Sequence, residues 1–198
     1  MRRRTFDALV SAAGLLLVAV LIVAGVLLTW GHNYASNQVT SQLSAQKIVF
    51  PTRNNPEFKA LPKADQAVMG QYAGQTMTTG AQAEAYANHF IAYHLSLIGG
   101  GKTYSQLSAL SRAHPTSTAL AGEVQTVFQG TTLRSMLLEA YGFWTFGQIA
   151  LIAAICSYAA AGLMLLLSIF GFAHLRRTAP DREILPGVAT HATPVTTA

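Results

Sequence analysis

Two stretches decide the fold of this chain: residues 8–30, ALVSAAGLLLVAVLIVAGVLLTW, and residues 140–175, AYGFWTFGQIALIAAICSYAAAGLMLLLSIFGFAHL. Neither stretch contains Asp, Glu, Lys or Arg. A helix rises about 1.5 Å per residue, so residues 8–30 extend roughly 33 Å, more than the hydrocarbon thickness of about 30 Å. We therefore predict two transmembrane helices. The second stretch is longer than one crossing needs, and we place its membrane core at about residues 145–171.

The composition of the whole chain agrees with a membrane protein. Of its 198 residues, 51% are hydrophobic and only 11% are charged, and the mean hydropathy is +0.33. Disordered chains combine low hydrophobicity with high net charge, so disorder is excluded for most of the sequence. The exception is the segment 176–198, rich in Thr, Ala and Pro, which we expect to be a disordered tail.

The first apolar stretch has two readings, a cleaved signal peptide or an uncleaved signal anchor. The apolar core of a signal peptide has about 7–15 residues and ends at small residues that the peptidase accepts. Here the apolar run is longer and ends in Trp30-Gly31-His32-Asn33-Tyr34. The sequence therefore predicts a signal anchor.

Basic and aromatic residues give the expected orientation of the two spans. The basic flanks are Arg2, Arg3 and Arg4 before the first span and Arg176 and Arg177 after the second. Trp30 and Trp144 mark the opposite ends as interface aromatics. The positive-inside rule then predicts an antiparallel pair in the cell membrane, with residues 1–7 and 176–198 in the cytoplasm and residues 31–139 outside.

The second span carries a face of small residues suited to close helix packing. Its members are Gly147, Ala150, Ala153, Ala154, Ser157 and Ala161. We expect this face to pack either on the first span or on another protein. Cys156, the only cysteine, lies within the span and is expected to be a small packing residue.

The outer segment, residues 31–139, is predicted to be a small all-helical domain. The first helix is expected to continue beyond the membrane toward Gln46, before a loop that contains three prolines. A short helix is expected over residues 63–72. Thr79 with Gln82 forms a capping-box pattern that predicts a helix over residues 80–98, ended by three glycines.

A second capping pattern, Thr103 with Gln106, predicts a short helix that closes before Pro115. A third helix is expected to end at Gly130, after which Thr131 or Thr132 caps the helix that becomes the second span. The predicted fold class is therefore an all-α membrane protein, with two antiparallel transmembrane helices flanking a helical extracytoplasmic domain.

Two patterns in the outer segment resemble chemical sites. Lys102-Thr103 after three glycines resembles the end of a phosphate-binding loop, but the first glycine of that motif would fall on Ser96, and helix precedes it. We interpret the glycines as a helix stop. His89 and His94 are five residues apart, about 140° around a helix, whereas paired metal ligands are usually four apart. His89 reaches a metal only with a ligand from another helix.

No catalytic constellation is visible, and we predict no enzyme activity, no cofactor and no metal site. The sequence has no nucleophile elbow, no cysteine nucleophile and no close acidic pair. Tyr86, His89 and Tyr93 share a more polar face that is a possible ligand surface. With Arg182 of the tail, six of the thirteen basic residues flank the spans, so the net charge of +5 does not indicate nucleic-acid binding.

Several segments together resemble a group of small bacterial two-span membrane proteins of unknown function. They are Met1-Arg2-Arg3-Arg4-Thr5-Phe6-Asp7, residues 78–87 (TTGAQAEAYA), Gly101-Lys102-Thr103-Tyr104, and Phe143-Trp144 ahead of Gly147-Gln148-Ile149-Ala150. Some members of that group carry the label aromatic ring-opening dioxygenase. Such enzymes hold non-haem iron with two His and a carboxylate, and no spacing here assembles that triad.

These features lead to two hypotheses of function. The first is an envelope-anchored interaction or accessory protein that acts through its outer helical domain, with the bilayer and a membrane-protein partner or a second copy as its contacts. The alternative is an extracytoplasmic sensor or ligand-binding module that signals through a separate partner. An enzyme and a channel rank below both.

Overall fold

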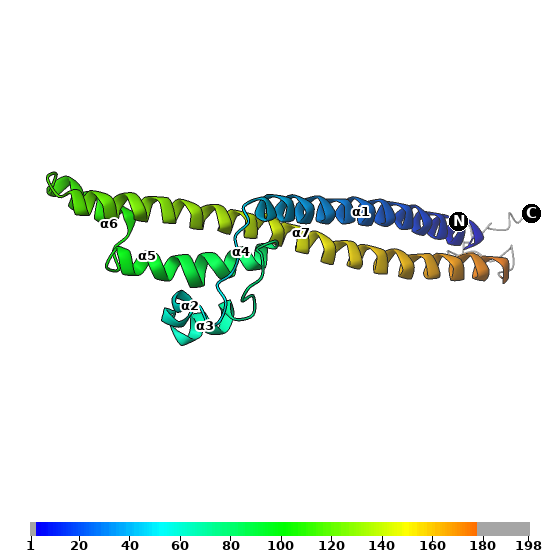
Figure 1. The fold of residues 1–198 in the computed structure, drawn as a ribbon. Helices are drawn as coiled ribbons and strands as arrows, with labels where there is room; N and C mark the ends of the chain where they lie inside the picture. The colour runs from blue at the N-terminus through cyan, green and yellow to red at the C-terminus, as the bar shows by residue number, and fades with distance from the viewer. Residues whose placement is uncertain (1–2, 178–198) are drawn as a thin grey trace, which may run out of the picture. The chain divides into compact units, whose positions relative to one another are not determined.

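The computed structural model describes residues 3–177, and these are helical apart from short connections (Figure 1). The helices are α1 (Arg3–Ala45), α2 (Pro56–Ala60), α3 (Lys63–Met69), α4 (Gly80–Tyr86), the π-helix η1 (Ala87–Ile91), α5 (Ala92–Ile98), α6 (Tyr104–Ala113) and α7 (Thr118–Arg177). Within the described residues there is no strand, and one isolated antiparallel bridge joins Val49 to Thr76. The predicted all-α class is confirmed. Arg2 and the predicted disordered tail after Arg177 lie outside the described residues.

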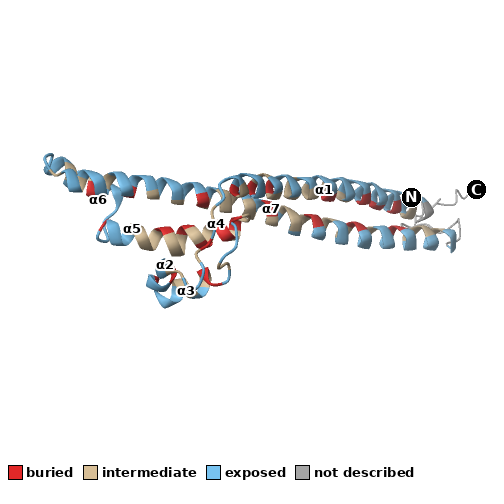
Figure 2. Cartoon of the chain, viewed as in Figure 1, coloured by how far each residue is buried: buried red, intermediate tan, exposed pale blue. Residues whose placement is uncertain are grey.

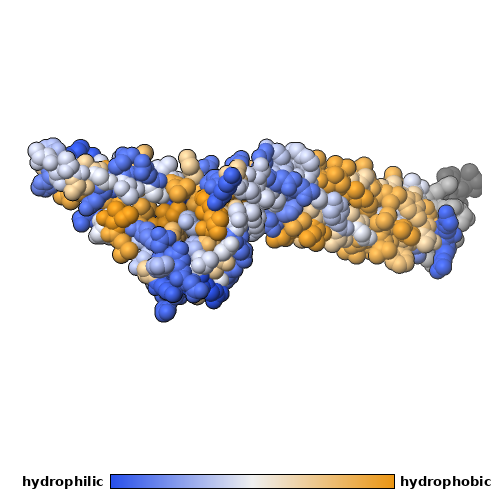
Figure 3. Space-filling model, viewed as in Figure 1, coloured by the Kyte–Doolittle hydropathy of each residue, from blue (hydrophilic) through white to orange (hydrophobic). Residues whose placement is uncertain are grey.

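Helices α1 and α7 contain the two predicted spans, and both are long and apolar enough to cross a membrane. Figure 3 shows hydrophobic residues gathered along the apolar parts of both helices. The expected continuation of the first helix is also confirmed, because α1 reaches Ala45 without interruption.

The chain divides into two compact units, and each is described by itself. One comprises the described residues of Met1–Leu27 and Ala153–Ala198, and the other comprises Leu28–Ile152. In the first unit, α1 and α7 approach each other through small residues. A Cβ atom on Gly14 would collide with the hydroxyl of Ser168, and Ser157 Oγ donates a hydrogen bond of 2.8 Å to the carbonyl oxygen of Leu21.

Burial on α7 in this first unit follows a seven-residue repeat. Ala154, Ala161 and Ser168 are buried and lie seven residues apart. Two helices that pack along a continuous seam show this spacing, because seven residues make about two turns. The apolar residues on the remaining faces are exposed (Figure 2), as expected for side chains that would meet lipid.

The second unit has its own hydrophobic core. It is built from the end of α1, the connection that follows, α2 to α5 and part of α7. The buried members are Val39, Leu43, Phe50, Phe58, Leu61, Met69, Met77, Ala83, Ala87, Ile91 and Leu137. Backbone hydrogen bonds fix the connection, since the amide of Phe50 donates to Gln75 and that of Met77 to Ile48.

The predicted loop around the prolines contains a short helix that the sequence analysis did not place. Helix α2 starts at Pro56. Proline has no amide hydrogen, but an amide in the first turn of a helix would have no acceptor within the helix, so no hydrogen bond is lost. The side chain of Asn55 caps the helix by accepting a hydrogen bond of 2.8 Å from the amide of Glu57. The helix expected over residues 63–72 is present but shorter, as α3 ends at Met69.

Both capping boxes are confirmed. Thr79 Oγ1 accepts from the amide of Gln82 at 3.3 Å and the Gln82 side chain accepts from the amide of Thr79 at 3.1 Å. Thr103 and Gln106 repeat the arrangement at the start of α6. The predicted helix over residues 80–98 is helical throughout, but its middle turn, Ala87–Ile91, is a π-helix, which no local sequence pattern indicated.

The predicted helix end at Gly130 is wrong. Helix α7 begins after Ser117, whose hydroxyl accepts from the amide of Leu120 at 3.3 Å, and runs through Gly130 to Arg177. Thr132 does not cap a new helix, because its hydroxyl donates back to the carbonyl of Phe128 at 2.9 Å. Gly130 instead allows α5 to lie close to α7, since a Cβ atom there would collide with the side chain of Leu95.

Candidate interaction groove

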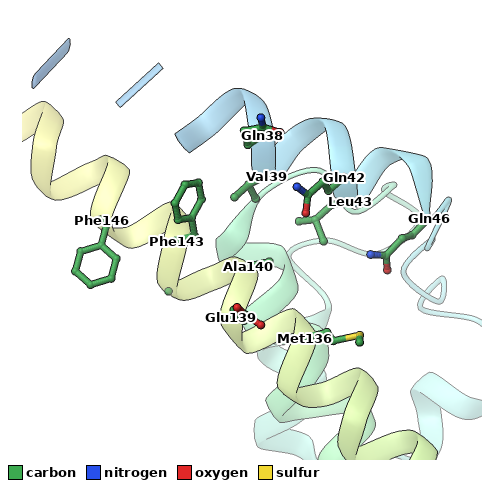
Figure 4. Close-up of a pocket in the computed structure, with 11 residues that line it drawn as sticks. Gln38, Val39, Gln42, Leu43, Gln46, Met136, Glu139, Ala140, Phe143 and Phe146 are labelled. Carbon is green, nitrogen blue, oxygen red and sulfur yellow. The ribbon is translucent and has the colours of Figure 1, made fainter. Parts of the chain in front are cut away.

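A groove of about 730 Å³ lies between α1 and α7 within the Leu28–Ile152 unit (Figure 4). Its α1 wall comes from two adjacent rows of residues. Gln38 and Gln42 are four residues apart and lie one above the other on the same face of α1, and Gln46 follows directly after the end of the helix. Val39 and Leu43 form the neighbouring row, and both belong to the buried core. The α1 wall therefore has an apolar base and an amide rim.

The α7 wall repeats this division. Met136, Glu139, Phe143 and Phe146 follow one another at spacings of three and four residues, and therefore share a face of the helix. Met136 is 60% exposed, Phe143 44% and Phe146 72%. In Figure 4, Phe143 is directed toward α1, while Glu139 and Met136 lie along the groove. Phe146 falls within the predicted membrane core, where it would meet lipid. Met136 and Phe143 precede that core, and large apolar side chains left exposed there mark a surface that a partner can cover.

The electrostatic character of the groove is simple. Glu139 is the one charged residue among those that line it in the described chain. The amide of Gln38 lies 3.5 Å from the Tyr34 hydroxyl, a long contact that binds the side chain weakly. The groove thus offers an apolar base, a single negative charge and amides able to donate or accept hydrogen bonds.

The walls of the groove are held together beyond its aromatic end. His32 Nδ1 donates a hydrogen bond of 2.9 Å to the carbonyl oxygen of Gly147, because a carbonyl can only accept. Gly147 also lets the helices approach, since a Cβ atom there would lie 3.0 Å from that of Ala35. The ring of Tyr34 meets Phe143 edge-on at 6.5 Å between centroids. These contacts set the width of the groove independently of an occupant.

The structure does not gather the predicted ligand face around one cavity. His89 Nδ1 lies 2.7 Å from Asp65 Oδ1 of α3, and the hydroxyl of Tyr93 donates to the carbonyl of Ala60 at 3.0 Å. The His89 contact therefore links α3 to the π-helix η1, and the Tyr93 contact links the end of α2 to α5.

Tyr86, the third residue of that face, lies among aromatic rings instead. Its centroid is 5.3 Å from that of Phe50 and 4.8 Å from that of Phe90, and it lines a second, smaller cavity. Burial, assisted by the nearby carboxylate of Glu57, raises the pKa of the Tyr86 hydroxyl above its ordinary value.

The six packing candidates on α7 are covered to different degrees. Gly147, Ala154 and Ala161 are buried, and Ala150, Ala153 and Ser157 are half-buried. Because Gly147 lies against α1 and Ser157 bonds to it, this part of the face is already used within the chain. Cys156 is exposed, so it is not packed within the described chain, and its expected role as a small packing residue stays a prediction. It lies on a different side of α7 from the buried repeat.

The other predicted residues occupy the helix ends or the second unit. Arg3 and Arg4 belong to the first turn of α1, and Arg176 and Arg177 close α7. Trp30 is 66% exposed and stacks on Tyr34 at 5.7 Å. Trp144 is half-buried against the core of the second unit, where a Cβ atom on Gly80 would collide with it.

Metal-binding and phosphate-binding chemistry find little support in the geometry. No group of three or more His, Cys, Asp or Glu comes together among residues 3–177. His89 and Asp65 remain a pair. Gly100 and Gly101 have positive φ angles after α5 and Thr103 caps α6, which is the predicted helix stop.

The groove was not predicted from the sequence. Its α1 wall had a local signal in the four-residue spacing of Gln38, Gln42 and Gln46, and its α7 wall in the open row that includes Phe143 and Phe146. No protein-family model, characterised protein or solved structure matches the chain.

Proposed function

We propose that this chain is a non-enzymatic, membrane-anchored interaction protein that binds a helix of a partner membrane protein in the groove between α1 and α7. The observation that carries the proposal is the groove of about 730 Å³, in which exposed apolar side chains lie beside a rim of amides. A cleft between two helices with an apolar base is a common receptor for a third, amphipathic helix.

The proposal includes an orientation in the cell membrane. The two spans form an antiparallel pair, both termini are cytoplasmic and residues 31–139 are outside. The contacts of the first unit support the pairing, since Gly14 meets Ser168 and Gly171 meets Ser11 further toward the N-terminus of α1. The basic residues at the far ends of both helices support the direction.

The chemistry of the groove specifies the helix that would occupy it. From Met136 to Phe146 the α7 wall covers eleven residues, about 15 Å of helix or nearly three turns. A partner helix of that length would place apolar residues at i, i+3, i+4 and i+7 against Met136 and Phe143, which are exposed on α7. It would also carry Lys or Arg opposite Glu139, because an unpaired carboxylate covered by a partner is costly.

Two glycines of α7 allow a matched test. A Cβ atom at Gly142 or at Gly122 would meet nothing within 4 Å, but only Gly142 lines the groove. The test is affinity purification from native membranes in mild detergent of the native chain and of the variants Gly142→Trp and Gly122→Trp. We expect a stoichiometric membrane protein with the native chain and with Gly122→Trp, and its loss with Gly142→Trp.

Two outcomes would contradict the groove as the docking site. One is a partner retained equally by both variants, and the other is recovery of the chain as a monomer with no partner at all. Recovery as a homo-oligomer that only Gly142→Trp dissociates would keep the groove and make a second copy the occupant.

A second candidate function is an extracytoplasmic ligand-binding or sensor module that signals through a separate partner. The observation that favours it is the smaller cavity of about 360 Å³ lined by Tyr86, in the same unit as the groove. A thermal-shift screen of small molecules tests this function, and a screen without any stabilising compound would count against it.

A further inference from the structure

The smaller cavity lies between the helix of α4, η1 and α5 on one side and α7 on the other. Tyr86, Phe90 and His94 form one wall, each one helical turn after the last. Their rings follow one another closely, with centroids 4.8 Å apart for Tyr86 and Phe90 and 4.4 Å apart for Phe90 and His94. Ile98 and Leu133 lie at its edge and are 41% and 39% exposed. Figure 3 shows the hydrophobic surface over α5.

The polar groups of this cavity are few and neutral. None of the residues that line it in the described chain is Asp, Glu, Lys or Arg. A charged ligand would therefore find no counter-ion in the lining, whereas the apolar side chains would gain contact with an apolar ligand. The lining thus favours an apolar neutral molecule over a phosphate, a carboxylate or an amine.

His94 gives the cavity one directed hydrogen-bonding group. Its Nδ1 lies 2.8 Å from the carbonyl oxygen of Phe90, and a carbonyl oxygen can only accept a hydrogen bond. Nδ1 therefore carries the proton, and in the neutral ring Nε2 is an acceptor. Among the described residues the hydrogen bond found for the His94 ring is the one at Nδ1, and His94 lines the cavity, so Nε2 is the acceptor that this ring can offer to a ligand.

The volume limits the size of that ligand. An engineered cavity of about 150 Å³ holds one benzene ring in another protein. On that scale, about 360 Å³ accommodates a molecule of about two fused rings. The volume is within the range of about 300–1,000 Å³ that small-molecule sites occupy, and it is too small for the three-turn helix proposed for the larger groove.

We infer that this cavity binds a small, neutral, largely apolar molecule that carries one hydroxyl group, with the hydroxyl donating to Nε2 of His94 and the rings lying against Tyr86 and Phe90. The site is separate from the groove between α1 and α7. A partner helix and this ligand can therefore be tested independently.

The test uses 2-naphthol as the probe and 2-methoxynaphthalene as a probe of similar shape that cannot donate. The full chain in lipid nanodiscs is dialysed to equilibrium against empty nanodiscs, which corrects for partition into lipid. We expect saturable binding of one 2-naphthol per chain. Binding of 2-methoxynaphthalene should be about fivefold weaker, the ratio that corresponds to a hydrogen bond of about 1 kcal/mol.

Three variants separate the role of His94 from that of the cavity. His94→Phe keeps a ring but removes the acceptor, so 2-naphthol should bind no better than 2-methoxynaphthalene. Thr126→Phe fills the cavity from α7, where Thr126 is exposed, and should abolish binding of both probes. Gln125→Phe adds the same ring to the next, exposed position outside the cavity and should leave both affinities unchanged.

Each other result overturns the inference. Absence of saturable binding excludes the ligand class, and equal affinity of the native chain for the two probes excludes the bond to His94. Binding that survives Thr126→Phe, or that Gln125→Phe weakens equally, places the probe elsewhere. Circular dichroism and the melting temperature of each variant establish that it is folded.

Discussion

Gly130 offers the sharpest test of how the second unit is packed. In the interior of an exposed helix, replacing Gly by Ala stabilises the folded state by about 0.5–1 kcal/mol, because Ala restricts the unfolded chain and favours the helix. At Gly130 the new Cβ atom would collide with the side chain of Leu95. We therefore expect Gly130→Ala to destabilise the protein, the opposite of the usual result.

The size of the effect follows from two opposing contributions. Overpacking by a methyl group costs about 1–3 kcal/mol. The atom that the new Cβ atom meets first is Cδ2 at the end of Leu95, a side chain that borders the smaller cavity, so we expect the lower part of that range. After the helix gain of about 0.5–1 kcal/mol is subtracted, the net loss is at most about 1 kcal/mol. For a chain of 198 residues a loss of that size corresponds to a fall in melting temperature of up to about 2–4 °C.

Gly122 is the matched control in the same helix. A Cβ atom at Gly122 would meet nothing within 4 Å, so Gly122→Ala should raise the melting temperature by about 2 °C through helix propensity alone. The assay is thermal unfolding of the purified chain in nanodiscs, followed by tryptophan fluorescence and circular dichroism.

Leu95 supplies the second half of the test. In a Leu95→Ala background the obstacle is gone, and Gly130→Ala should then stabilise the protein as Gly122→Ala does. Such a change of sign is a coupling between neighbouring residues in a double-mutant cycle. A rise in melting temperature for Gly130→Ala in the otherwise native chain would refute the close contact of α5 with α7.

Three further predictions concern single contacts. Burial raises the pKa of Tyr86, so the folded state holds this proton more tightly and stability should fall as the pH rises above about 10; Tyr86→Phe should reduce that loss in an alkaline titration of melting temperature. Thr79→Ala removes the side-chain acceptor of the first capping box and should cost about 1 kcal/mol, or about 2–4 °C in melting temperature, with the matched change Thr131→Ala as control. Ser157→Ala removes the bond to Leu21 and should lower resistance to unfolding in sodium dodecyl sulfate by about 0.6 kcal/mol, whereas Cys156→Ala on the exposed side should not.

Local signals predicted a large part of the fold. The two transmembrane helices were predicted from only the length of the apolar stretches and the absence of charged residues in them. The helix starts at Thr79 and Thr103 were predicted because a cap and its partner three residues later satisfy backbone amides within a single turn. Such patterns depend on residues close in sequence, and tertiary contacts did not override them.

The features that were predicted wrongly or not at all depend on residues far apart in sequence. Gly130 was predicted to end a helix. In the structure it lies within α7, where the absence of a side chain leaves room for Leu95 of a different helix. The π-turn at Ala87–Ile91 likewise has partners elsewhere, since Arg134 of α7 donates to the carbonyl of Ala87 and to the side chain of Asn88. Neither contact has a counterpart in local periodicity.

The candidate site was less predictable than the fold for the same reason. A groove between α1 and α7 joins Gln42 to Glu139, nearly one hundred residues further along the chain. The predicted ligand face contained side chains of suitable chemistry, yet His89 is hydrogen-bonded to Asp65 and Tyr93 to the carbonyl oxygen of Ala60. Residue type indicated where polar contacts would form, but not which partners would form them.

We propose that residues 31–139 lie outside the cell. This is tested most directly by labelling intact cells with a membrane-impermeant maleimide, using chains in which Cys156→Ser removes the native thiol. One variant carries Gly122→Cys and the other Ala198→Cys. We expect position 122 to be labelled in intact cells and position 198 only after permeabilisation. Labelling of position 198 but not of position 122 in intact cells would contradict it.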